Sequence, residues 1–164
     1  MRYLAAALIA LIPMFLWPGA GAAATCPGFV DGKVYPPDVD RFYAMRAINI
    51  VRAGLANDQP TLSDLVLQEA KFEIWRGDYT TSPRQAGSAG LMEMVADLKP
   101  TGFQFATVRP GPISVEPSKC IWDVTILFRT EEQETGVTME FDFLDGWLVR
   151  ASGREVEITE GDIR

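Results

Sequence analysis

Residues 119–158 decide the fold; they read KCIWDVTILFRTEEQETGVTMEFDFLDGWLVRASGREVEI. Apolar and polar side chains alternate along residues 119–129 and again along 137–144, which is the pattern of strands with one buried face. The pair Asp145-Gly146 predicts a tight turn into a third strand over residues 147–158. A meander of this length needs a covering layer. The side chains expected to face that layer are Trp122, Val124, Ile126 and Phe128 in the first strand, and Val137, Met139, Phe141 and Phe143 in the second.

The covering layer is predicted to be helical. Asp38 is expected to cap a helix over residues 39–55, and Thr61 with Asp64 resembles a capping box for a second, short helix ending near Glu69. Ser88 is expected to cap a third helix that ends before Pro100. The side chains expected to be buried on these helices are Phe42, Met45, Ile48, Val51 and Leu55 in the first, Leu62, Leu65 and Val66 in the second, and Leu91, Met92, Val95 and Leu98 in the third.

Two further strands are predicted, over residues 70–76 and 103–109, and residues 80–87 are expected to form a polar loop. The chain is therefore predicted to be an α+β domain, with three helices packed on a strongly curved, mainly antiparallel sheet. We expect a single domain over residues 38–164, because about 140 residues suffice for one core and not for two.

The N-terminal segment has the pattern of a secretory signal peptide. Arg2 precedes an apolar stretch up to Trp17, and small residues lead to an expected cleavage site after Ala24. The apolar run is shorter than the roughly 20 residues of a spanning helix. Residues 25–37, rich in proline and glycine, are then expected to form an extended strap. The sequence predicts a periplasmic or secreted protein with no membrane attachment after cleavage.

Cysteine count and charge restrict the partners. Cys26 and Cys120 are the only cysteines, and in an exported domain they are expected to form a disulfide. Free thiols and redox chemistry remain alternatives, although the spacing is not Cys-x-x-Cys. The chain has 22 acidic and 15 basic residues and a net charge of −7. An acidic chain without a basic run is not expected to bind nucleic acid.

The order of elements resembles the nuclear transport factor 2-like superfamily, which includes ketosteroid isomerases and polyketide cyclases. Three segments carry the resemblance: Ala70-Lys71-Phe72-Glu73-Ile74-Trp75, Ala89-Gly90-Leu91-Met92-Glu93-Met94-Val95, and Met139-Glu140-Phe141-Asp142-Phe143-Leu144-Asp145-Gly146-Trp147-Leu148-Val149. The resemblance covers roughly residues 38–158 and implies a cone-shaped, cystatin-like fold. It also implies that ligands bind at the mouth of the cone.

The catalytic positions of those enzymes do not carry over. The base of a ketosteroid isomerase falls near Ile74 and its oxyanion acid near Met139, and both positions are apolar here. The chain has no histidine, which excludes Ser-His-Asp and Cys-His catalysis and the commonest metal ligand. No phosphate loop, dinucleotide fingerprint or calcium loop occurs, so no cofactor and no metal are predicted.

Asp123 is the one weak candidate for a catalytic residue. It lies on the less apolar face of its strand, so it is either a carboxylate in a partly apolar cavity or a solvated residue paired with an arginine such as Arg150. Tyr43, Trp75 and Tyr79 are candidates to line a cavity mouth with it, with core packing as the alternative. Burial in a cavity would raise the pKa of Asp123.

Three functions remain open from the sequence. The first is a non-catalytic exported domain that binds a small, largely apolar ligand in its cone or acts through a homodimer. The second is a carboxylate-driven isomerase or cyclase with Asp123 as general base. The third is an interaction subunit whose cone is filled by its own side chains. A dimer through the sheet is expected because Trp122, Ile126 and Phe128 would otherwise leave apolar area uncovered.

Overall fold

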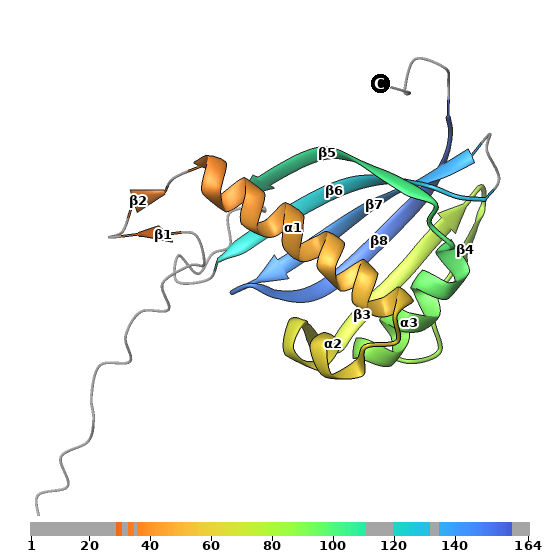
Figure 1. The fold of residues 1–164 in the computed structure, drawn as a ribbon. Coiled ribbons are helices and arrows are strands. Elements are labelled where there is room, and N and C mark those ends of the chain that lie inside the picture. Colours follow the sequence, from red (N-terminus) through yellow and green to blue (C-terminus); the bar gives the residue numbers. More distant parts are fainter. Residues whose placement is uncertain (1–28, 31–32, 35, 111–119, 132–134, 159–164) are drawn as a thin grey trace, which may run out of the picture.

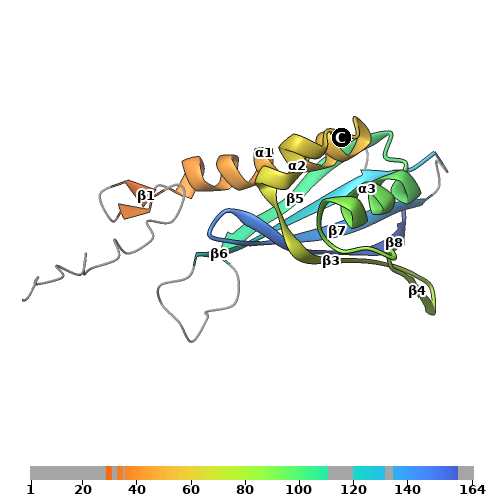
Figure 2. The same ribbon diagram turned by 90° about the horizontal axis from the view of Figure 1, so that it is seen from below.

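The computed structural model describes residues 29–30, 33–34, 36–110, 120–131 and 135–158, and in it three helices lie on one face of a six-stranded sheet (Figure 1). The strand order is β4-β3-β8-β7-β6-β5, and only β3 and β8 pair in parallel. Figure 2 shows the strands curling beneath the helices. The elements are β1 (Phe29–Val30), β2 (Lys33–Val34), α1 (Pro36–Leu55), α2 (Gln59–Leu65), β3 (Val66–Arg76), β4 (Tyr79–Thr81), α3 (Gly87–Leu98), β5 (Gly102–Pro110), β6 (Ile121–Arg129), β7 (Thr135–Leu144) and β8 (Trp147–Glu157).

The C-terminal meander forms as predicted. All eight side chains expected to face the covering layer are at most 7% exposed. Asp145 and Gly146 have φ angles of 52° and 86°, the left-handed conformation of a tight hairpin turn. This turn is also fixed to the start of β6: the Cys120 amide donates to Asp145 Oδ1 at 3.0 Å, and the Asp145 amide donates to the Cys120 carbonyl at 2.8 Å. The hairpin is therefore anchored at its tip.

Helix α1 buries a different stripe from the predicted one. Ile48 and Val51 are buried as expected, whereas Phe42, Met45 and Leu55 are 36%, 44% and 51% exposed. The prediction for these three was wrong because two apolar stripes run along the helix, and the other stripe packs against the sheet. The buried stripe holds Val39, Tyr43, Ala47, Ile50 and Ala53.

Helix α2 begins and ends earlier than predicted. Its N-cap is Asp58, whose carboxylate accepts from the Thr61 amide at 3.2 Å and the Thr61 hydroxyl at 2.6 Å. The helix stops at Leu65, so Val66 already begins β3. The N-cap of α3 is Ala86 and not Ser88, and the expected polar loop contains β4 at its start.

The interior between the helices and the sheet is filled by aromatic and aliphatic side chains. The ring of Tyr43 stacks on Trp122 at 5.4 Å and lies 5.3 Å from the ring of Phe143. A Cβ on Gly153 would clash with Met139 Sδ, so a larger residue here would force that side chain to move. The largest fully buried residues are Tyr43, Phe128, Phe141, Phe143, Ile48, Ile50, Leu62, Ile74, Leu91, Leu98, Ile126 and Met139.

Part of the predicted organisation lies outside the described residues. This holds for the signal peptide, residues 1–24, and for Cys26, so the disulfide stays a prediction; Cys120 is 3% exposed at the start of β6. Within the predicted strap, β1 pairs with β2 in a short antiparallel hairpin. Among the helices described, none combines the length and apolarity needed to cross a membrane.

Candidate functional site

Four charged residues line up across four strands on the face of the sheet that carries no helix, which we call the helix-free face. In the register, Arg109 of β5 lies opposite Asp123 of β6, Asp123 opposite Asp142 of β7, and Asp142 opposite Arg150 of β8. Because side chains alternate along a strand, positions flanked by buried core residues point away from the helices. The sheet therefore presents an Arg-Asp-Asp-Arg row on this face.

A third carboxylate joins the row and makes a compact cluster. Asp123, Glu140 and Asp142 each place a carboxylate oxygen within 4.8 Å of the others. Arg150 Nε donates to Asp142 Oδ2 at 2.6 Å, and Arg109 Nη2 donates to Glu140 Oε1 at 3.2 Å. The contact of Arg109 with Asp123 is longer, with 3.8 Å between Nε and Oδ2. We call these five residues the carboxylate cluster; Asp123 is its most buried and least well paired member.

Burial raises the pKa of the two aspartates in the cluster. Burial raises the pKa of Asp123 above its usual range, and repulsion from Asp142 and Glu140 raises it further. Burial also raises the pKa of Asp142, against the opposing effect of its hydrogen bond with Arg150. The Asp142 Oδ1 atom is buried and has no hydrogen-bond partner among the described residues. The carboxylates are therefore held together at an electrostatic cost.

The cluster borders a groove of about 610 Å³ whose other walls are largely apolar. The register of β7 with β8 shifts between Asp142 and Phe143, and this shift leaves Val149 as an extra residue beside Arg150. Both residues line the groove, together with Ile121 and Leu144. The groove thus combines apolar walls with charges of both signs.

Two kinds of chemistry fit this arrangement. A buried carboxylate with a raised pKa can take up a proton, which is the property required of a general base. Three carboxylates can also coordinate a divalent cation through oxygen. Arg109 and Arg150 already contribute two positive charges to Asp123, Glu140 and Asp142, so the cluster as a whole carries a net charge of only −1.

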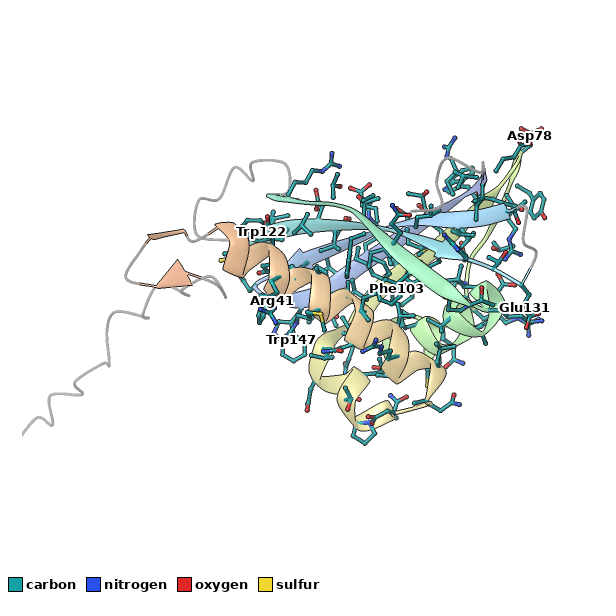
Figure 3. The ribbon with its side chains drawn as sticks, turned by 45° about the horizontal axis from the view of Figure 1, so that its top comes forward. Arg41, Asp78, Phe103, Trp122, Glu131 and Trp147 are labelled. Carbon is teal, nitrogen blue, oxygen red and sulfur yellow. The ribbon has the colours of Figure 1, made fainter. Side chains whose placement is uncertain are left out.

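The four pocket candidates from the sequence are not brought together. Tyr43 lies in the core, fully buried against Trp122. Trp75 lines a second groove of about 400 Å³, which shares Glu140 with the groove beside Asp123. Tyr79 is 61% exposed beside Asp78, and Figure 3 shows Asp78 far from Trp122, the neighbour of Asp123.

The sequence prediction missed most of the cluster. Glu140 and Asp142 occupy the polar positions of an alternating strand, which are normally solvated. Only the register places them beside Asp123, and no local signal marks that register. Arg150 was considered as the partner of Asp123, but it binds Asp142, and the arginine near Asp123 is Arg109. Ile74 and Met139, the apolar positions that replace the isomerase residues, are both buried in the core.

No family model matches the sequence, and no curated protein matches it. Solved structures do: a nuclear transport factor 2-like protein of unknown function from Shewanella baltica is 12% identical, with 77% of this chain and 99% of that one covered at a TM-score of 0.50. Another nuclear transport factor 2-like protein of unknown function, from Silicibacter pomeroyi, is 11% identical over 71% of this chain and 94% of that one, at a TM-score of 0.49. A cystatin-like fold protein from Burkholderia xenovorans is 12% identical over 76% and 96%, at 0.48. This chain therefore has the fold of the nuclear transport factor 2-like superfamily, as its order of elements predicted.

Proposed function

We propose that this chain is an exported, non-catalytic binding domain, periplasmic or secreted, that acts through the helix-free face of its sheet. The observation that carries the proposal is the filled interior. Tyr43, Phe128, Phe141 and Phe143 are at most 1% exposed between the helices and the sheet. These four side chains fill the space between the helices and the sheet where they lie, and this filling favours binding at the outer surface.

A second copy of the chain is the partner that this face fits best. Trp122, Ile126 and Phe128 do not form the dimer surface expected from the sequence, because the helices of their own chain cover them. The helix-free face supplies a different reason. Ile121, Leu144 and Val149 are only partly buried there, beside a row that carries both charge signs. A surface with both signs can face a copy of itself with arginine over carboxylate.

Sedimentation velocity of the purified protein at micromolar concentrations tests this proposal. We expect a dimer that the substitution Val149→Glu converts to monomer, because it adds a fourth carboxylate at the groove. The control is Ala56→Glu, at an exposed position at the end of α1, which should leave the dimer intact. A wild-type monomer, or a dimer unaffected by Val149→Glu, would contradict it.

The second candidate function is proton abstraction by Asp123 from carbon next to a carbonyl. The burial of Asp123 and its position on the 610 Å³ groove favour this function. NMR in deuterated water can follow exchange of the α-protons of a panel of small cyclic ketones. An enzyme of this kind would catalyse exchange, and Asp123→Asn would abolish it. Absence of exchange, or equal exchange by the variant, would exclude the base.

A further inference from the structure

The exposed stripe of α1 forms one wall of a groove remote from the carboxylate cluster. Phe42 and Met45, on successive turns of the helix, line it together with Leu65 at the end of α2. The polar residues on the same groove are Arg41, Arg46 and Asn49. Figure 3 shows Arg41 on the first half of the helix. We call this groove the α1 groove; its volume is about 390 Å³.

Arg46 is a cation without an acidic partner among the described residues. Its Nε atom is buried and has no hydrogen-bond acceptor, and its Cζ lies 5.4 Å from the centre of the Phe42 ring. Arg46 is half-buried, and this burial lowers the pKa of its guanidinium. A partly desolvated charge without a counterion is costly, and an anion that reaches it offsets that cost.

The lack of an acidic partner at Arg46 among the described residues differs from the pairing of Arg76, another partly buried arginine. The guanidinium of Arg76 has a carboxylate partner, with 3.0 Å between Arg76 Nη2 and Asp97 Oδ2. The chain has seven more acidic than basic residues, yet no described carboxylate pairs with Arg46 or Arg41. The α1 groove is therefore a local basic, apolar site on a negative protein.

We propose that the α1 groove binds an apolar carboxylic acid of medium chain length. The guanidinium of Arg46 presents a planar fork of donors that matches the two oxygens of a carboxylate. Phe42, Met45 and Leu65 offer the surface on which a hydrocarbon chain loses contact with water. The volume lies at the lower end of the range of about 300–1,000 Å³ for small-molecule sites. This site is separate from the helix-free face, so the two proposals stand or fall independently.

Calorimetric titration of the purified protein with decanoate tests the site. We expect one decanoate per chain, and binding at least about tenfold weaker in Arg46→Met, because a charge-assisted bidentate contact is lost while the alkyl stem is kept. Arg46→Lys keeps the charge without the fork and should bind with intermediate affinity. The matched control is Arg52→Met, an exposed position on the same helix, which should bind as the wild type does.

Three other probes separate the parts of the ligand. Decanol and acetate should both bind much more weakly than decanoate, because one lacks the charge and the other the chain. Decyl phosphate that bound better than decanoate would overturn the choice of a carboxylate. Absence of decanoate binding, or equal affinity in wild type, Arg46→Met and Arg46→Lys, would overturn the site itself. Val149→Glu, which tests the helix-free face, should leave decanoate binding unchanged.

Discussion

The two faces of one sheet differ in what they contact, although the same strands build both. Toward the helices, β6 and β7 present Trp122, Val124 and Phe128 with Met139 and Phe141, none of them more than 7% exposed. On the helix-free face, the intervening positions carry the carboxylate cluster and two grooves. Alternation along a strand thus separates the residues that stabilise the fold from those available for binding. The resemblance predicts that ligands bind on the helix-covered side. In this chain, these side chains of the helix-covered face are packed in the core.

The largest expected effect lies on the helix-covered face. Phe141→Ala should lower the free energy of unfolding by about 3–5 kcal/mol, because it leaves a cavity in a filled core. Thr138→Ala, on the other face of the same strand, should change it by no more than about 0.5 kcal/mol. Urea denaturation measures both. Similar losses for the two variants would contradict the division between the faces. Phe141→Leu provides a milder version if Phe141→Ala does not fold.

The second largest loss of stability is expected where Gly153 approaches the side chain of Met139. Gly153→Ala places a methyl group against Met139 Sδ and Val137, so we expect a loss of about 1–3 kcal/mol from overpacking. The adjacent Ser152→Ala points to the helix-free face and should be nearly neutral. Thermal unfolding of the pair distinguishes them. An unchanged midpoint for Gly153→Ala would show that the core has free volume at this point.

Substitutions on the helix-free face should change the stability less, and by an amount that depends on pH. Arg150→Met removes the donor to Asp142 and should destabilise the protein by about 1 kcal/mol at neutral pH, since Arg150 is half exposed. The pKa of Asp142 is already raised in the folded state, and loss of Arg150 raises it further. Stability of the variant should then fall as pH rises from the ordinary aspartate pKa through this raised value.

In acid, where Asp142 is protonated in both folded and unfolded states, Arg150→Met and wild type should become similar. Arg154→Met, an exposed position on the same strand, should show neither the loss nor the pH dependence. Denaturation series at several pH values measure the difference. A deficit that stayed constant from acid to neutral pH would mean that Arg150 acts through packing alone.

The smallest expected effect is a gain in stability, from the substitution Asp123→Asn. Asp123→Asn removes a buried carboxylate that two others repel, and its raised pKa means that deprotonation costs stability as pH rises. We expect the variant to be about 0.5–1 kcal/mol more stable at neutral pH and equal to wild type in acid. Denaturation at both pH values measures this. Destabilisation at neutral pH would show that the ion pair with Arg109 outweighs the repulsion.

The fold could be predicted from the sequence more fully than the arrangement of side chains on the surface. The meander was predictable because alternation and the Asp145-Gly146 turn are local signals. The phase of α1 was not, because Phe42 and Met45 have the same helical spacing as buried residues, and only the docked sheet selects between the stripes. The carboxylate cluster was out of reach for a related reason: Asp123 and Asp142 become neighbours through strand register, which depends on the whole sheet.

Contacts between copies of the chain would test most directly whether binding takes place on the helix-free face or inside the cone. Isotope-filtered NMR on an equimolar mixture of labelled and unlabelled protein records contacts between chains alone. We expect intermolecular signals from the methyl groups of Ile121, Leu144 and Val149, and none from Met139 in the filled core. Absence of intermolecular signals, or signals from Met45 on the exposed side of α1 in place of these three, would contradict binding on the helix-free face.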